Sequence, residues 1–117
     1  VNTTPDSAVL QKDDLIKVIS LKSNQKISSP LTITGEARGT WYFEASFPVR
    51  IEDVNGKVLA QVPAQAQGEW TTENYVPFSV TLNFVKPQSG NGIIVFERDN
   101  PSGLPENANE LRVPIQF

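Results

Sequence analysis

Charged side chains around one short segment are the first candidates for chemistry in this sequence. Arg38 follows Glu36 and precedes Glu44, with Gly39 between them. A guanidinium group is planar and can bind a carboxylate through two parallel hydrogen bonds. The group therefore predicts either a charged recognition site or an internal tie between a bend and a carboxylate, and we favour the tie. The bend is expected at Gly39, where we expect the backbone geometry to require glycine.

Aromatic side chains with a polar group form the second set of candidates. Trp41 shares alternate positions with Phe43 and Phe47, which predicts that it lies in the core. Tyr42 then points the other way, toward solvent. Trp70 follows Gly-Glu and has two interpretations, a platform on which a sugar stacks or a plug that covers the core. We favour the plug.

The segment from Asp99 to Glu106 is an unusual loop, rich in proline, asparagine and glycine. Asp and Asn side chains bond to nearby backbone groups, so a shaped turn explains its composition. Its carboxylates and amide oxygens are also the ligand types that calcium prefers, but their spacing matches no EF-hand. We predict no metal and no cofactor. The candidate binding residues are Arg38, Tyr42, Trp70, Asp99 and Asn100.

The composition removes most catalytic machinery. The 117 residues include no histidine and no cysteine, which excludes Ser-His-Asp and Cys-His nucleophiles and a Cys-ligated zinc site. A pair of carboxylates could still serve as in glycosidases. Exposed acids on strands and loops are ordinary, however, and the expected fold suggests no deep cleft. We therefore predict that the chain is not an enzyme and has no catalytic residues.

The charge argues against two classes of partner. The formal net charge is −3, and the ten lysines and arginines form no cluster along the sequence. A nucleic-acid binder needs a cationic footprint, and a polybasic membrane contact needs the same. No apolar run approaches the roughly 20 residues of a transmembrane helix. Because methionine is absent, we expect a fragment or a processed form, attached to a membrane only through an anchor that preceded Val1.

Alternating apolar residues predict a long strand over 41–53. Asn55-Gly56 follows, the strongest short signal for a β-hairpin, and the chain is expected to return through 58–62. Pro48 interrupts the long strand and predicts an edge position or a bulge, because proline cannot donate to the ladder.

Five further strands are predicted: those over 31–35, 78–84 and 111–117 from alternation, and those over 15–20 and 93–97 from apolar residues at consecutive positions. Residues 1–14 are polar and predict a flexible tail or linker, with an ordered strand beginning near Val9 as the alternative. Seven short strands without a helical pattern predict one all-β domain over 15–117. We expect an immunoglobulin-like sandwich of two antiparallel sheets.

Several motifs together resemble one family. They are Ser29-Pro30-Leu31-Thr32-Ile33-Thr34-Gly35, Ala37-Arg38-Gly39-Thr40-Trp41-Tyr42-Phe43-Glu44, Pro48-Val49-Arg50, Gly68-Glu69-Trp70, Pro77-Phe78 and Glu97-Arg98-Asp99-Asn100-Pro101-Ser102-Gly103. Their order and spacing are similar to those of the immunoglobulin-like domain of bacterial spore germination proteins. The resemblance extends from about Ile16 to Phe117.

The resemblance implies a location and a kind of role. Members are extracytoplasmic bacterial domains, often in lipoproteins, and no catalytic activity is attached to them. We therefore expect a non-catalytic, monomeric interaction or adhesion module in the cell envelope, with an envelope protein or a cell-wall glycan as partner. The alternative is a carbohydrate-binding module for peptidoglycan or another wall polymer, which should present a row of exposed aromatic side chains. A third class is a structural spacer without such a surface.

Overall fold

The fold is known from a computed structural model that describes residues 10–12, 15–87, 90–99, 103–104 and 109–117. Within these ranges the regular elements are β-strands and one 3-10 turn, η2 (Gly39–Trp41). The strands are β1 (Leu10–Lys12), β2 (Ile16–Val18), β3 (Gln25–Lys26), β4 (Leu31–Arg38), β5 (Ser46–Asp53), β6 (Val58–Ala66), β7 (Tyr75–Leu82), β8 (Asn91–Glu97) and β9 (Glu110–Gln116).

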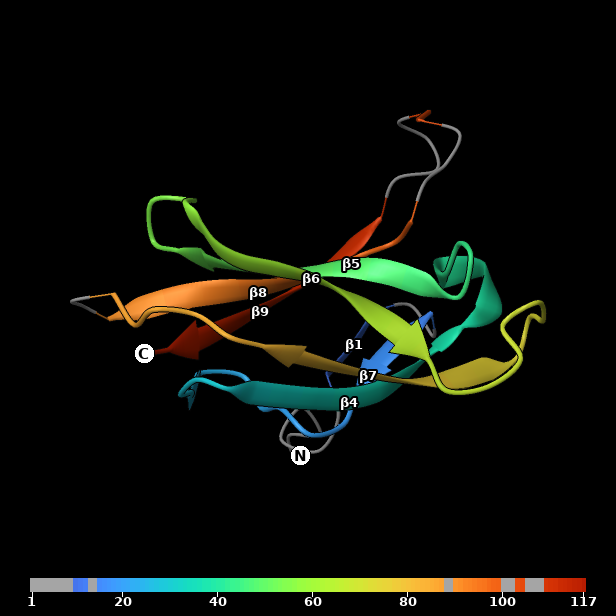
Figure 1. Cartoon of the computed structure of the whole chain (residues 1–117), viewed down its shortest axis with the longest axis horizontal. Helices are drawn as coiled ribbons and strands as arrows, with labels where there is room; N and C mark the ends of the chain where they lie inside the picture. Colours follow the sequence, from blue (N-terminus) through green and yellow to red (C-terminus); the bar gives the residue numbers. More distant parts are fainter. Residues whose placement is uncertain (1–9, 13–14, 88–89, 100–102, 105–108) are drawn as a thin grey trace, which may run out of the picture.

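The strands fold into two facing layers (Figure 1). One layer has the order β1-β2-β4-β7 and the other the order β6-β5-β8-β9-β3. The layers are continuous at one corner, where β6 and β7 share the pairs Gln65 with Ser79 and Ala66 with Phe78. All pairings are antiparallel except that of β3 with β9. The predicted immunoglobulin-like β-sandwich is confirmed, and each of the seven predicted strands is present in some form.

Alternation along the strands places apolar side chains between the layers. In β4 the buried Ile33 lies between the exposed Thr32 and Thr34, and the buried Ala37 lies between two half-buried charged residues. A chain of edge-to-face aromatic contacts crosses the core: the ring centroids of Tyr42 and Phe47 are 5.2 Å apart, and those of Phe47 and Phe78 are 5.0 Å apart. Because Phe47 and Phe78 belong to opposite layers, these contacts join the two layers directly.

The predicted strand over 41–53 is wrong in its first half. Residues 39–41 form η2, and β5 begins only at Ser46. Between them the chain reverses, since Phe43 and Ser46 exchange two backbone hydrogen bonds of 2.9 and 3.1 Å. The reversal requires positive φ at Glu44 (51°) and Ala45 (67°), which neither residue type signals in the sequence. Phe43, predicted to be buried, is 41% exposed.

The second half of the predicted strand and its hairpin are confirmed. The Gly56 N–H donates to the Asp53 carbonyl, and the Asp53 N–H donates to the Lys57 carbonyl, both at 3.0 Å. The loop is therefore one residue longer than a two-residue turn, with Gly56 at φ 83°. Pro48 pairs with Pro63 on β6, while pairing of β5 with β8 begins only at Val49. Its position is thus an edge on the β8 side, as predicted.

Part of the predicted tail is a strand. β1 pairs antiparallel with β2 over three residues, from Leu10 opposite Val18 to Lys12 opposite Ile16. This corresponds to the alternative of an ordered first strand near Val9. The rest of the predicted tail, residues 1–9 and 13–14, lies outside the described residues.

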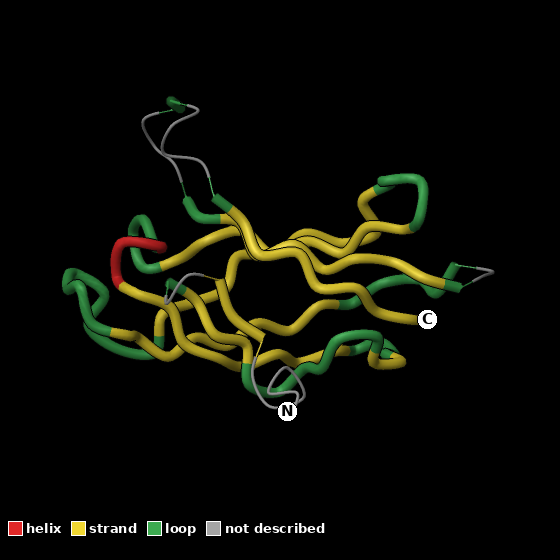
Figure 2. Tube along the Cα trace, turned by 180° about the vertical axis from the view of Figure 1, so that it is seen from behind, coloured by secondary structure: helices red, strands yellow, loops and turns green. Residues whose placement is uncertain are grey.

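The sandwich has two ends, which we name by what they carry. The η2 end holds η2, the turn at 43–46, and the loop at 67–74 between β6 and β7. The hairpin end holds the β5–β6 turn at 54–57, the segments 22–26 and 83–87, and Phe117. Figure 2 shows η2, in red, at the opposite end of the molecule from the C-terminus.

Candidate functional site

Four of the five predicted binding residues meet around η2. Arg38 is the residue immediately before η2, and Tyr42 is the residue immediately after it. The Asp99 N–H donates to the Trp41 carbonyl at 3.0 Å, which brings the end of β8 to the same place. Trp70 arrives from the β6–β7 loop, and its carbonyl approaches Gly39 closely. Asn100 lies outside the described residues.

Gly39 is required at this junction by crowding. A Cβ added there would lie 1.9 Å from the Thr72 carbonyl oxygen and 2.3 Å from that of Trp70. Its own N–H donates to the Asn74 carbonyl at 3.1 Å. The absence of a side chain therefore lets the β6–β7 loop pack directly against η2. The predicted need for glycine is confirmed, and its cause is the close approach of two backbone segments.

Tyr42 does not face solvent, so the predicted exposure is wrong. Its side chain is 4% exposed, and its hydroxyl donates to the Val76 carbonyl at 2.6 Å. Burial raises the pKa of the phenol well above its usual value. Trp41 is buried as predicted, and its Nε1 has no hydrogen-bond partner among the described residues. The prediction failed because Trp41 belongs to η2 and not to a strand, so Trp41 and Tyr42 do not point to opposite faces of a sheet.

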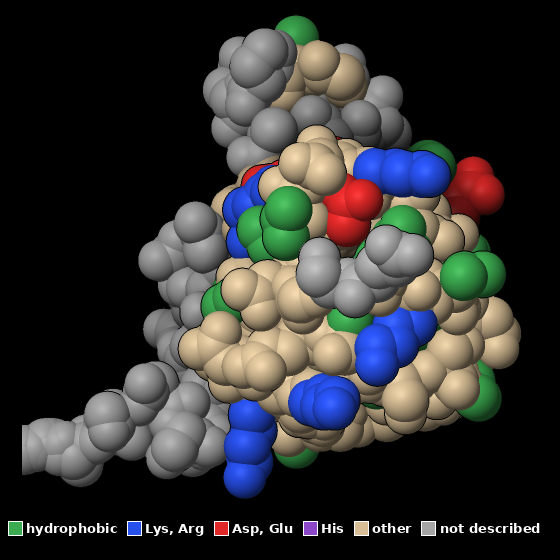
Figure 3. Space-filling model, turned by 90° about the vertical axis from the view of Figure 1, so that its left-hand side faces the viewer, with side chains coloured by type: hydrophobic (Ala, Val, Ile, Leu, Met, Phe, Trp, Pro, Cys, Tyr) green, Lys and Arg blue, Asp and Glu red, His purple; other side chains and the backbone are tan. Residues whose placement is uncertain are grey.

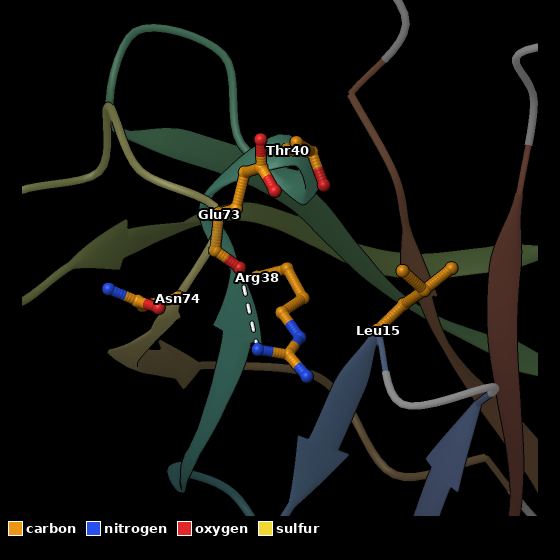
Figure 4. A pocket seen from close by; sticks show the side chains of 5 residues that line it. All are labelled: Leu15, Arg38, Thr40, Glu73 and Asn74. Atoms are coloured by element: carbon orange, nitrogen blue, oxygen red, sulfur yellow. Dashed lines mark hydrogen bonds between the residues drawn. The ribbon is translucent and has the colours of Figure 1, made fainter.

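A pocket of about 420 Å³ opens beside η2. The residues that line it are Leu15, Arg38, Thr40, Glu73 and Asn74. Figure 4 shows that they come from separate elements: Leu15 from the start of β2, Arg38 from the end of β4, and Glu73 and Asn74 from the β6–β7 loop. One apolar side chain thus faces several polar ones, a lining that suits a ligand with both kinds of surface.

Arg38 is held by the protein on the rim of this pocket. Its Nη1 donates to the Glu73 carbonyl at 3.5 Å, and its guanidinium carbon lies 3.9 Å from the centroid of the Tyr75 ring. Lys17 Nζ also lies over this ring, at 4.5 Å. Two cations therefore lie near one ring, on the face of β2, β4 and β7 that also carries Glu36. These contacts tie Arg38 to a carbonyl and an aromatic ring, where the sequence predicted a carboxylate.

Trp70 is half-buried and packs against the core, which agrees with the plug interpretation. The loop around it is shaped by local hydrogen bonds. The Thr71 hydroxyl and the Thr71 N–H both donate to the Glu69 carboxylate, at 2.8 and 3.2 Å. These bonds lower the pKa of Glu69. The local network shapes the turn on either side of Trp70.

The Asp99 loop contributes to this end through its first residues. Arg98 Nε donates to the Thr40 carbonyl at 3.2 Å, beside the bond from Asp99 to Trp41. Most of the segment proposed as a calcium loop, including Glu106, lies outside the described residues. Among the described residues no group of three acidic side chains is arranged to hold a metal. Glu73 and Asn74, which form part of the pocket wall, were not predicted as site residues. Polar residues of this kind occur in most surface loops, so nothing in the sequence distinguishes them.

A second cluster of charge lies on the outer face of β5, β8 and β9. Arg50 bonds to Glu52 and, at 2.8 Å, to Glu97, and Arg112 bonds at 2.8 Å to Glu110. The carboxylate of Glu52 raises the pKa of Arg50 by hydrogen bonding. These side chains lie over Val95, which is fully buried although it points away from the core. We interpret this network as a cover for the outer face of the sheet.

Comparison with known proteins identifies the family. The model of the immunoglobulin-like domain of bacterial spore germination matches residues 15–103, more than half of the chain. The chain belongs to this family. Strand β9 lies beyond the matched range but pairs along the whole of β8. No match was found among curated proteins or among solved structures. In the described part of the chain, no helix is long and apolar enough to cross a membrane.

Proposed function

We propose that this germination-associated immunoglobulin-like domain is a non-catalytic interaction module that works outside the cytoplasmic membrane and binds an envelope protein at the η2 end. The single observation that carries the proposal is the pocket of about 420 Å³ beside η2. The resemblance to extracytoplasmic domains supports the location. The absence of histidine and cysteine from the sequence supports a role without catalysis.

The construction of the pocket supports recognition. Its walls come from Arg38 and the β6–β7 loop, which are fixed by the contacts of Gly39 and Tyr75. A site whose walls are already ordered loses little conformational entropy on binding. Its exposed polar groups, from Thr40, Glu73 and Asn74, can bond to the backbone or side chains of a protein segment.

The distribution of aromatic side chains favours a protein over a glycan. Trp41 and Tyr42 are buried in the core. Trp70 and Tyr75 are half-buried, and two cations lie over the ring of Tyr75. A sugar platform needs free ring faces, and these four residues do not form an exposed row. The wall-polymer alternative is therefore kept as an outcome of the test.

The test selects peptides from a random library on the wild-type domain and maps them by amide NMR. We expect selected peptides to shift the amides of Thr40, Glu73 and Asn74. Asn74→Ala should weaken their binding severalfold, and the matched control Asn83→Ala, an exposed asparagine beyond the end of β7, should not. Peptides that bind elsewhere would contradict the proposal. Shifts at the same amides with soluble peptidoglycan fragments, without peptide binding, would move the assignment to the glycan.

A further inference from the structure

Lysines that are far apart in the sequence lie at the hairpin end of the folded domain. Lys57 closes the β5–β6 hairpin, and Asp53 of that hairpin pairs with Gly92 on β8. Gly92 pairs with Ile115 on β9, which in turn pairs with Gln25 on β3. This row ends next to Lys26 and to the 22–25 turn that holds Lys22. Two distant parts of the chain, one with Lys57 and one with Lys22 and Lys26, therefore lie at the same end of this layer.

A fourth lysine joins this end from the other layer. The rings of Phe84 and Phe117 are in contact at 5.9 Å, and the Phe117 N–H donates to the Gly90 carbonyl at 2.8 Å. These contacts fix the 83–87 segment, with Lys86, beside the last residue of the chain. All four side chains are exposed. Figure 3, seen from the hairpin end, shows lysine and arginine side chains spread over this surface.

Aliphatic side chains stand exposed among these lysines. Val85 is 84% exposed next to Lys86, and Val54 and Val58 are 65% and 46% exposed on either side of Lys57. Figure 3 shows apolar side chains close to the basic ones on this face. A purely charged surface would suit any soluble polyanion. Aliphatic side chains beside lysines suit an interface that is anionic at its surface and apolar beneath it.

The acids nearest to this end are already engaged. The Asp53 carboxylate accepts the N–H groups of Asn55 and Lys57 at 2.8 and 3.0 Å. Glu52 is 9% exposed and bonds to Arg50 on the outer face of the sheet. The other acids of the described chain lie toward the η2 end or on the strand ends that reach it. Both acids keep their charge, but the four exposed lysines outnumber them, so the hairpin end is locally positive although the whole chain carries −3.

We propose that the hairpin end docks on an anionic phospholipid surface, with Lys22, Lys26, Lys57 and Lys86 over the headgroups and Val54, Val58 and Val85 entering the interface. Charge complementarity selects the lipid surface, and the exposed valines distinguish it from a soluble polyanion. Basic side chains near such a surface each contribute to attraction and are weakened by salt. This contact lies at the opposite end from the η2 pocket and does not depend on it.

The test measures binding of the domain to vesicles of phosphatidylcholine, with and without phosphatidylglycerol, by co-sedimentation. We expect binding only to the anionic vesicles, weakened by salt. Lys57→Gln with Lys86→Gln should reduce it about tenfold or more. The control, Gln65→Glu with Gln67→Glu, changes the net charge by the same two units on exposed side chains near the η2 end. It should bind nearly as well as the wild type.

A second pair of variants separates a membrane from a soluble polyanion. Val85→Ser should weaken vesicle binding severalfold, and Phe43→Ser, an exposed apolar residue at the η2 end, should not. Equal losses for the two double charge variants would overturn the proposal, because net charge alone would then explain binding. Binding to dextran sulfate that matches vesicle binding, with Val85→Ser unchanged, would assign the surface to a polyanion instead.

Discussion

The two ends of the sandwich are built differently. At the η2 end, distant backbone segments press on one another, with Gly39 against the β6–β7 loop and the Tyr42 hydroxyl on the Val76 carbonyl. At the hairpin end the β5–β6 turn is held by bonds within a few residues, from the Asp53 carboxylate to the N–H groups of Asn55 and Lys57, and its side chains Val54 and Lys57 are exposed. The first arrangement fixes the shape of a pocket. The second leaves side chains replaceable, which suits a contact dominated by charge.

Substitution of Gly39 should have the largest effect, because it attacks the packing that defines the η2 end. A Cβ at Gly39 would collide with two carbonyl oxygens that belong to backbone. We expect Gly39→Ala to lower the free energy of unfolding by about 3 kcal/mol, measured by urea denaturation. The control is Gly68→Ala in the adjoining loop, where a Cβ meets open space. That change should stay within about 0.5 kcal/mol. Equal effects would mean that the crowding at Gly39 does not hold the η2 end together.

Trp70→Ala should have the next largest effect. The side chain is half-buried against the core, so its removal should cost less than the ~3–5 kcal/mol of a fully buried aromatic residue, about 2 kcal/mol. Thermal and urea unfolding of the variant measure this. An unchanged stability together with lost peptide binding would instead make Trp70 a recognition residue. The η2 end would then resemble the hairpin end in presenting its side chains to a partner.

Tyr42→Phe should cost about 1 kcal/mol, since it leaves the Val76 carbonyl buried without its donor. The pH dependence offers a sharper test. The folded-state pKa of Tyr42 is raised above the unfolded value of 10.0. Its contribution to stability is therefore fully present below pH 10 and decreases as the pH rises above it. The advantage of the wild type over Tyr42→Phe should shrink above pH 10 in urea titrations. A constant difference would mean that Tyr42 is accessible to solvent.

Much of the fold follows from sequence pattern. Ile33 and Ala37 on β4, and Phe47 and Val49 on β5, alternate with polar residues because each strand has one buried face. The failure at 41–45 has a physical cause. Glu44 and Ala45 adopt positive φ, which these residue types do not announce, and the apolar residues around them happen to continue the alternation. Long-range packing on η2 selected the turn over local preference.

The candidate site was predictable only in part. Arg38 and Trp70 attracted attention by residue type, and the structure brings both to η2. Glu73 and Asn74 contribute as walls of a pocket whose position depends on the path of the β6–β7 loop. The lysine surface was not predictable from linear spacing, because Lys26 and Lys57 come to the same end of one layer only through the order β5-β8-β9-β3. The positions of the pocket wall and of the lysine surface both depend on long-range chain arrangement, which local sequence does not encode.

Gly56→Ala should have the smallest effect and measures how replaceable the hairpin end is. Gly56 adopts φ 83°, where a Cβ is disfavoured, but that Cβ would meet no neighbour within 4 Å. The conformational cost of about 1–2 kcal/mol is partly offset by the reduced entropy of the unfolded chain. We expect a net loss of about 1 kcal/mol or less in urea unfolding, with vesicle binding retained. A loss as large as that of Gly39→Ala would show that the hairpin end, too, depends on its exact backbone. The η2 end and the hairpin end would then not differ in how strongly they depend on backbone packing.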